Sequence, residues 1–305
     1  MISLITELSN IIKLNILNTR ELAMLIWLLI LLIWMILDKK IRKSLYGVVK
    51  AFCNIKLITP IILFLIYTIC VVVILFKVQL WGTFLLKDTI VWFISSGIFT
   101  VFKSIDGSKK EGYYKKVLSD NFKITVLLQF ILNEYTFNLV IELLIVPITT
   151  LIACMLVVID MKKENVQVKN FLQYINVFIG FSILFFSIKS IYNDINNFAS
   201  YNTLLKLLVP TILSILSIIP AYILAFYSEY ESIYIRIGFK QNRSKKLNTF
   251  LKLRLLTFSR FSRRRLVEIW KSYSYELLLA KDIKEIESVI RKYEIEENKN
   301  GIQRR

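Results

Sequence analysis

The chain has 305 residues, of which 56% are hydrophobic, and its mean hydropathy is +0.58. Soluble domains average about 45–50% apolar residues, so this composition excludes an ordinary soluble globule. The 40 Lys and Arg residues outnumber the 22 Asp and Glu residues, which gives a formal net charge of +18. In a membrane protein this excess indicates contact with anionic lipids of the cytoplasmic leaflet, so we do not expect nucleic acid as the partner.

The sequence also lacks the usual carriers of enzymatic chemistry. It contains no histidine, which is the commonest general base and the commonest metal ligand. Its three cysteines, Cys53, Cys70 and Cys154, are far apart and form no CxxC motif. No Gly-rich phosphate loop and no nucleophile motif are visible. We therefore predict a protein that is not an enzyme, with no catalytic residue, no metal and no cofactor.

Long apolar runs predict an all-α fold, a polytopic transmembrane helical bundle. Runs of about 18 or more apolar residues are typical of helices that span a bilayer. The predicted spans lie near residues 22–37, 57–76, 85–102, 135–159, 171–188 and 207–227. They define a transmembrane domain over residues 22–227. Residues 1–21 precede it, and their apolar positions at helical spacing indicate an interfacial segment, with a frayed terminus as the alternative.

The first span is short, since 16 residues at 1.5 Å each give about 24 Å. We expect Arg20 and Lys39 to extend their side chains to the interfaces and so complete it. Pro210 and Pro220 fall inside the last span, where other groups must satisfy the backbone carbonyls that they leave without a donor.

Residues 124–159 decide on which side of the membrane each loop lies. The loops at residues 38–56 and 103–123 and the C-terminal segment are all basic, and basic loops are typically cytoplasmic. Six simple crossings cannot put all of them on one side. In one alternative, residues 124–159 enter the membrane and return as a re-entrant element or kinked hairpin, which leaves the N-terminus outside. In the other, there are six ordinary crossings. The C-terminal segment is cytoplasmic in both.

Glu142 is the strongest candidate for an intramembrane polar site. A carboxyl group inside a span is costly, and such residues commonly face the bundle interior and have a function. The functional interpretation is a proton or cation site, and the alternative is a neutral Glu that forms a hydrogen bond with another helix. Lys87 and Asp88 complete the candidate polar site, although a plain helix start would also explain them.

Residues 228–305 predict a basic, helical, cytoplasmic tail with 19 basic and 10 acidic residues. Apolar residues interleave with the basic ones in its first half, which predicts a helix that lies on anionic lipid. The predicted lipid-contact residues are Arg243, Lys245, Lys246, Lys252, Arg254, Arg260, Arg263, Arg264 and Arg265. In the second half, Leu279, Ile283, Ile286, Ile290 and Tyr293 form a helical seam that we expect to pack within the tail.

Two runs carry a resemblance to known proteins. They are LLKDTIVWFISSGIFTVF at residues 85–102 and YTFNLVIELLIVP at residues 135–147. These runs resemble an uncharacterised family of bacterial multi-pass inner-membrane proteins. The resemblance implies a location in the bacterial cytoplasmic membrane and does not imply an activity.

These observations leave two classes of function. The first is a membrane scaffold, sensor or effector whose cytoplasmic tail engages the lipid surface or a protein partner. The second is a channel or transporter that conducts ions or a small solute past Glu142, for which a ring of identical subunits could supply the pore. The expected partners are therefore anionic lipids, with a cytoplasmic protein and further copies of the chain left open.

Overall fold

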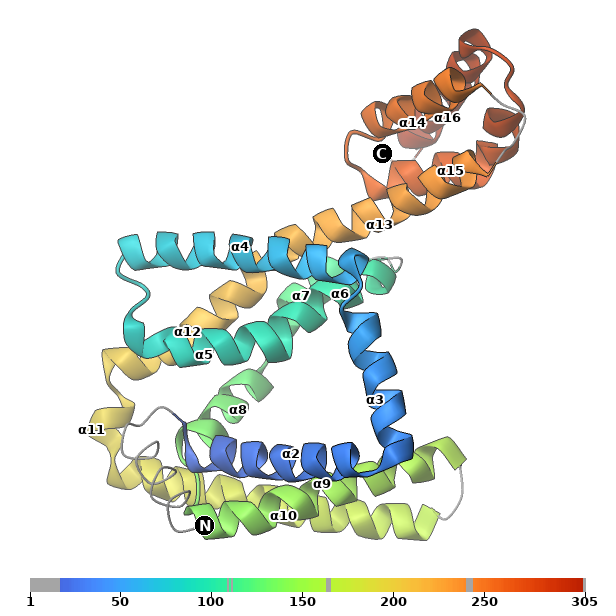
Figure 1. Ribbon diagram of the computed structural model, residues 1–305. Helices are drawn as coiled ribbons and strands as arrows, with labels where there is room; N and C mark the ends of the chain where they lie inside the picture. The colour runs from blue at the N-terminus through green and yellow to red at the C-terminus, as the bar shows by residue number, and fades with distance from the viewer. Residues whose placement is uncertain (1–16, 109, 111, 163–165, 240–243, 304–305) are drawn as a thin grey trace. The chain divides into compact units, whose positions relative to one another are not determined.

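The computed structural model describes residues 17–108, 110, 112–162, 166–239 and 244–303, and this part of the chain is helical without any strand (Figure 1). Six of its helical stretches are long and apolar enough to cross a membrane. They are Thr19–Leu37, Ile55–Lys77, Thr83–Gly107, Leu139–Met161, Val166–Asn193 and Tyr201–Gly238. The predicted all-α fold with six candidate spans is therefore confirmed. Most of the predicted interfacial segment, residues 1–16, lies outside the described residues.

The chain divides into two compact units. Unit 1 is formed by Met1–Ser96 and Val117–Ile215, and unit 2 by Gly97–Lys116 and Leu216–Arg305. This division follows the packing of the chain, whereas the predicted boundaries at residues 21 and 227 concern the membrane. Those boundaries therefore stay a prediction.

Unit 1 begins with three helices joined by very short connections: α2 (Thr19–Leu37), α3 (Lys39–Phe52) and α4 (Ile55–Lys77). Polar side chains mark each start. Asn18 caps α2 in a capping box with Glu21, Asp38 caps α3, and Asn54 caps α4. These caps lie outside the apolar runs, which explains why α2 and α4 begin before the predicted spans.

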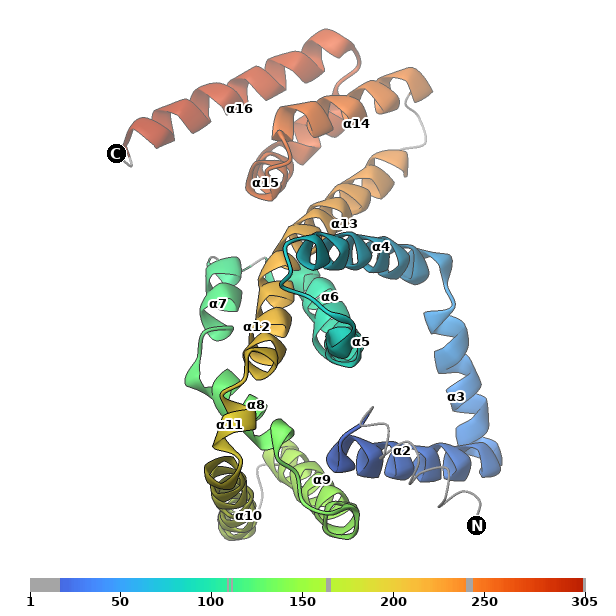
Figure 2. The ribbon, with the colours of Figure 1, turned by 90° about the vertical axis from the view of Figure 1, so that its left-hand side faces the viewer.

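The rest of unit 1 contains the helices that surround the candidate site. They are a 3₁₀ turn at Thr83–Leu85, α5 (Leu86–Trp92), α8 (Ile124–Glu134), α9 (Leu139–Lys162), α10 (Val166–Asn193), α11 (Ile195–Phe198) and α12 (Tyr201–Leu216). α9 lies beside α2 and α10, and α8 lies against α10 (Figures 1 and 2). Residues 124–159 thus form two helices with a break at residues 135–138.

Unit 2 contains α6 (Ile98–Gly107), α13 (Ile218–Gly238), α14 (Lys245–Ser259), α15 (Arg263–Leu279) and α16 (Ile283–Gln303), and α7 (Tyr113–Asp120) belongs to it up to Lys116. A π-helical turn at Phe93–Gly97 precedes α6. α6 and α13 approach closely because the residues between them are small. Ser104 is fully buried, and its Oγ donates to the carbonyl oxygen of Ala221 at 2.7 Å.

A single hydrophobic core connects α13 with the C-terminal helices of unit 2. Phe226, Ile233 and Ile237 of α13 pack with buried residues of α14, α15 and α16. In α16, Ile286, Ile290 and Tyr293 of the predicted seam are buried in this core, so their packing within the tail is confirmed. The other two seam residues, Leu279 and Ile283, are about half exposed, because the helix is interrupted between them.

The two prolines of the last candidate span have different effects. Pro210 lies inside α12, whereas Pro220 is the third residue of α13. The helix is interrupted at Ser217, so Pro220 falls in a first turn, where a missing N–H group costs little.

Candidate functional site

Polar and charged side chains gather at one end of unit 1, which we call the polar end. It brings together residues that are far apart in the sequence. Asn18 Nδ2 donates to the carbonyl oxygen of Asn133, and Thr19 Oγ1 donates to the carbonyl oxygen of Phe137. The polar end consists of residues 18–21, 79–89, 132–142 and 187–206.

The helices of unit 1 alternate in direction with respect to the polar end. The first turns of α2, α5, α9 and α12 lie there, as do the last turns of α4, α8 and α10, because contacts join these residues. α8 is the one helix of this series that belongs to no candidate span among the described residues, since its 11 residues extend only about 16 Å. When α8 is counted, the number of described helices in this alternating series is odd, so the series begins at the polar end and finishes away from it.

The most buried polar contact of the polar end joins α2 to α9. Arg20 Nη2 donates to Glu142 Oε1 at 3.0 Å, and Arg20 Nε donates to Oε2 at 3.1 Å. The backbone N–H of Phe137 donates to Glu142 Oε1 at 3.0 Å. The carboxyl group of Glu142 is fully buried, and a bidentate contact of this kind is typical of an ionised carboxylate. The Arg20 side chain therefore lies against Glu142, and its extension to a membrane interface stays a prediction.

Glu21, the next residue of α2, contacts α5. Lys87 Nζ lies 3.2 Å from Glu21 Oε2 and 3.9 Å from Asp88 Oδ1. Asp88 Oδ2 is buried and has no hydrogen-bond partner among the described residues. A buried carboxylate oxygen without a donor is costly, so this atom is a site where a ligand could bind.

Two further polar contacts join α8 and the residues after it to α12 and to the end of α10. Lys206 Nζ lies 2.7 Å from Glu134 Oε1, and Tyr135 donates its hydroxyl to Asp194 Oδ2 at 3.1 Å. Burial, followed by the hydrogen bond to the Asp194 carboxylate, raises the pKa of Tyr135 from 10.0 to about 12. The phenol thus stays neutral at physiological pH and acts as a donor.

A cavity of about 310 Å³ lies among α2, α5, α8 and α12 within unit 1. Three carboxylates and two ammonium groups line it, which leaves one formal negative charge in excess. These groups belong to Glu21, Lys87, Asp88, Glu134 and Lys206. A volume near 300 Å³ is at the lower limit of small-molecule sites, so a small solute or a hydrated cation would fit.

The structure therefore brings the three predicted site residues to one end of unit 1, in two separate clusters. Glu142 pairs with Arg20, whereas Lys87 and Asp88 line the cavity with Glu21. Three further residues of this site, Glu21, Glu134 and Lys206, emerge only from the structure. Their signal was a charge at the edge of an apolar run, which the sequence alone could not assign to a partner.

The predicted lipid-contact residues are involved in the fold of unit 2 to different extents. Arg263 pairs with Glu229, Arg265 with Glu297 and Arg264 with Glu268. Further contacts are those of Arg254 with Glu287 and of Lys252, whose Nζ lies 3.2 Å from the ring centroid of Tyr234. Arg243 lies outside the described residues. The lipid contact of these residues stays a prediction.

The apolar residues that alternate with these basic residues do not form one exposed face. Leu251 and Leu255 are fully buried in the core of unit 2, whereas Leu253 is 57% exposed. α14 therefore uses its main apolar stripe within its own unit, which leaves less apolar surface for a bilayer.

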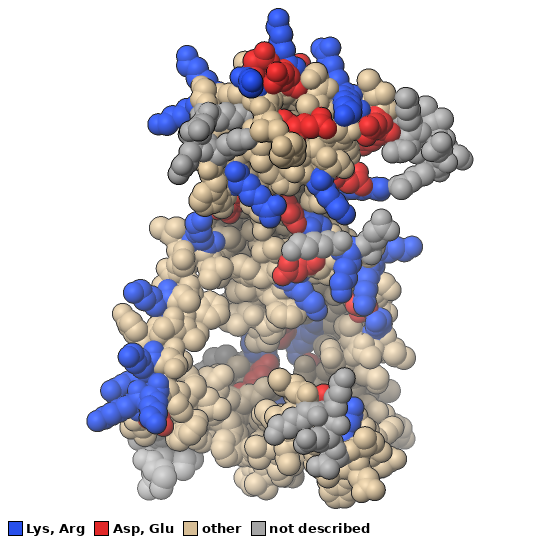
Figure 3. Space-filling model, turned by 90° about the vertical axis from the view of Figure 1, so that its right-hand side faces the viewer, with Lys and Arg blue, Asp and Glu red and all other residues tan. Residues whose placement is uncertain are grey.

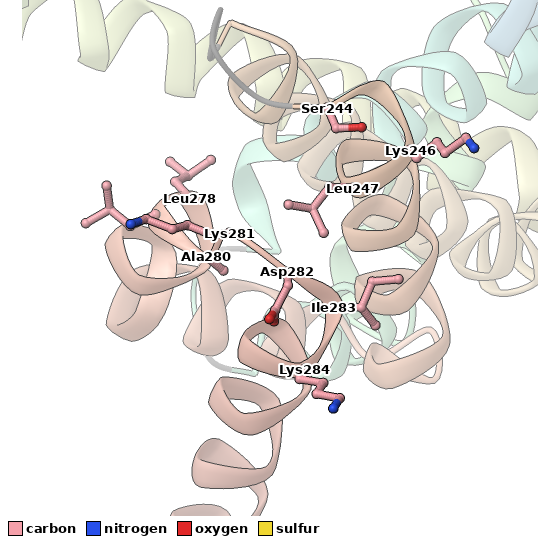
Figure 4. A pocket seen from close by; sticks show the side chains of 10 residues that line it. Ser244, Lys246, Leu247, Leu278, Ala280, Lys281, Asp282, Ile283 and Lys284 are labelled. Atoms are coloured by element: carbon pink, nitrogen blue, oxygen red, sulfur yellow. The ribbon is translucent and has the colours of Figure 1, made fainter.

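Unit 2 has an open groove of about 820 Å³ between the start of α14 and the connection from α15 to α16 (Figure 4). Leu247, Leu278 and Ile283 supply apolar surface, and Figure 4 shows their side chains along it. The charged lining residues are Lys246, Lys281, Asp282 and Lys284. The groove is therefore partly apolar and, by formal charge, positive.

Among the described residues, no three side chains of the His, Cys, Asp or Glu type lie close enough to hold a metal ion. Comparison of the chain with protein-family models, with curated proteins and with solved structures gave no match. What the fold defines is the class: an all-helical protein with six helices that could span a membrane. A more specific function must therefore be inferred from the geometry within each unit.

Proposed function

We propose that the chain is an integral membrane scaffold or sensor whose C-terminal helices bind a cytoplasmic protein. One observation carries this proposal. α13 belongs to a candidate span, Tyr201–Gly238, and its second half supplies core residues to α14, α15 and α16. Because α13 is part of the candidate span and also of the core of the C-terminal helices, a force that a bound partner exerts on these helices acts directly on the span. A flexible linker would have separated the two.

The groove of unit 2 supports a partner of a particular kind. Its three lysines and one aspartate favour an acidic partner, and its apolar lining favours a partner with exposed apolar side chains. We therefore propose an acidic amphipathic protein segment as the occupant of the groove. A groove that binds an apolar helix face flanked by charge is a common mode of peptide recognition.

The alternation of helices at the polar end supports a cytoplasmic position for the C-terminal helices. If α8 and α9 form a kinked hairpin that enters and leaves on one side, the order of the spans along the chain puts the basic residues 38–56, 103–123 and 228–265 on one side of the membrane. Basic loops are retained on the cytoplasmic side, so this arrangement puts the N-terminus outside. α8 alone is shorter than the hydrocarbon core of about 30 Å, and its packing against α10 supports this short limb.

The location in a bacterial cytoplasmic membrane rests on the resemblance of residues 85–102 and 135–147. Sidedness can be measured on its own by labelling single cysteines in intact cells. A label at Asp160 or Lys169 should react only after the cells are opened. Labelling of these positions in intact cells would contradict the hairpin arrangement.

The docking proposal is tested with a photoreactive amino acid placed at Leu247 in the full-length protein in its native membrane. We expect crosslinks to a protein segment rich in Asp and Glu, and we expect the triple variant Lys246→Glu, Lys281→Glu, Lys284→Glu to lose them. The matched control is a probe at Tyr275, which is 75% exposed on α15 and does not line the groove. Crosslinks to lipid, or crosslinks that ignore the charge reversal, would refute the docking proposal.

A second candidate function is a conduit for cations, and the unpartnered Asp88 Oδ2 in the cavity of unit 1 favours it. In this second candidate function Asp88 replaces Glu142 as the residue that binds the cation, because Arg20 already neutralises the charge of Glu142. Proton or K⁺ flux into proteoliposomes should be lost in Asp88→Asn if this function is correct. Flux that is absent from the wild-type protein would exclude it and leave the scaffold proposal.

A further inference from the structure

α3 joins two candidate spans and has short connections at both ends. Only Asp38 separates it from α2, and Cys53 and Asn54 separate it from α4. Asp38 Oδ1 accepts the N–H groups of Lys40 and Ile41 at 2.8 and 3.2 Å, which fixes the turn into the helix. Since α2 and α4 are each long enough to cross a bilayer, their adjoining ends must reach the same membrane surface. α3 runs from one of these ends to the other (Figures 1 and 2).

The sequence of α3 has two opposite faces. Ile41, Leu45, Val48 and Phe52 follow one another at intervals of four, three and four residues, which places them in one stripe of an α-helix. Lys39, Lys43 and Lys50 lie on the opposite side of the helix, and Lys40 and Arg42 flank them. No acidic residue occurs between the cap Asp38 and the end of α3.

Both faces of α3 are open in unit 1. None of its side chains is buried against the described residues, and Val48 and Phe52 of the apolar stripe are 51% and 64% exposed. Figure 3, which faces this side of the molecule, shows Lys and Arg side chains along α3 at its left-hand edge. A helix of 14 residues with one apolar stripe and one basic stripe is typical of a segment that lies in a membrane interface.

We infer that α3 lies flat in the headgroup region of an anionic leaflet. Its apolar stripe enters the boundary of the acyl chains, and its basic stripe binds lipid phosphates. Two observations select lipid as the occupant. The helix ends are fixed at a membrane surface by the adjoining spans, and five basic residues without an acid match anionic headgroups. The occupant of the tail groove is a separate matter, because α3 belongs to unit 1.

The experiment uses the full-length protein in lipid vesicles that contain phosphatidylglycerol. In a background where Cys53, Cys70 and Cys154 are replaced by serine, an environment-sensitive fluorophore is attached to Val48→Cys or, as the matched control, to Lys50→Cys. We expect nitroxide-labelled lipid to quench the probe at position 48 and water-soluble iodide to quench the probe at position 50. Equal quenching of both probes by iodide would overturn the inference, and so would shielding of position 48 from both quenchers, which would indicate a protein neighbour such as a second copy.

A second measurement tests the lipid charge. With the probe at position 48, nitroxide-labelled phosphatidylglycerol should quench more than labelled phosphatidylcholine at the same bulk fraction. Changing Lys39, Lys43 and Lys50 to Gln should remove this difference while the apolar stripe remains in the lipid. No difference in the protein with all three lysines would overturn the anionic preference. If a label at position 48 prevents folding, Leu45→Cys with Lys43→Cys as its control gives the same comparison.

Discussion

Arg20 and Glu142 lie 122 positions apart in the sequence, yet two hydrogen bonds of 3.0 and 3.1 Å join their side chains. Only 14% of the Arg20 side chain and none of the Glu142 side chain is exposed. Burying two charges has a large desolvation cost, which offsets most of their attraction. The contribution of the pair to stability is therefore seen mainly when one partner is removed and the other charge stays buried.

We predict that Arg20→Met lowers the free energy of unfolding by about 3 kcal/mol, because it leaves the Glu142 carboxylate buried without its counter-charge. The double variant Arg20→Met, Glu142→Met should be more stable than Arg20→Met alone. Thermal unfolding in detergent measures both. Lys77→Met, at the exposed end of α4, is the control. A double variant that is less stable than either single variant would contradict the assignment of a compensated ion pair.

The pair of Lys206 with Glu134 should contribute less than the pair of Arg20 with Glu142. Its side chains are 34% and 25% exposed, so solvent screens the interaction despite the distance of 2.7 Å. A double-mutant cycle with Lys206→Met and Glu134→Gln should give a coupling energy of about 0.5–1 kcal/mol. The same cycle on Arg20 and Glu142 should give a larger value, and the reverse order would show that burial does not govern these contacts.

The Tyr135 phenol should titrate far above its ordinary range. Its pKa is raised from 10.0 to about 12, so the folded state favours the protonated phenol. The resulting stability is complete below pH 10 and is lost as the pH rises to about 12. Asp194→Asn removes the second cause of the shift and leaves the larger one, burial, so the pKa should fall but stay above 10. Tyrosinate absorbance, with Tyr135→Phe subtracted, measures this, and an unchanged pKa in Asp194→Asn would contradict the contact.

Truncation of Leu251 should cost much more stability than truncation of Leu253, although the two residues are only two positions apart on α14. Leu251 is fully buried, so Leu251→Ala should cost about 2–5 kcal/mol. Leu253 is 57% exposed, so Leu253→Ala should change stability by about 0.5 kcal/mol or less. Limited proteolysis of the full-length protein at residues 228–305 gives a readout of this unit. A larger effect at Leu253 would instead favour a lipid-facing α14.

The candidate spans could be predicted because each needs a long apolar run, and such runs are visible without any contact information. The helix starts were less visible. Each start depends on a single small polar residue: Asn18, Asn54 or Asp282. Asp282 Oδ1 accepts the N–H group of Glu285, so α15 ends at Leu279 and a new helix, α16, begins at Ile283. The predicted continuous seam therefore failed at Leu279 and Ile283, where the chain turns.

Pairing could not be predicted from the sequence. Arg20 at the edge of one run and Glu142 inside another were both visible, but any of several basic residues could have been the partner of Glu142. The tertiary packing of α2 against α9 determines that Arg20 is the partner of Glu142. By contrast, the two faces of α3 follow from spacing alone, since Ile41, Leu45, Val48 and Phe52 recur at helical intervals within the basic loop at residues 38–56.

The close contact between Ser104 and Ala221 has a mechanical consequence. Because the Ser104 hydroxyl donates directly to the backbone carbonyl of Ala221, α6 and α13 cannot slide or rotate past each other without breaking this hydrogen bond. If the proposed partner twists α13 at Ile233 and Ile237, we expect α6 to turn with it, because this hydrogen bond joins the two helices. Replacing Ser104 or Ala221 by a bulkier residue would therefore separate α6 from α13 and remove the mechanical link between them.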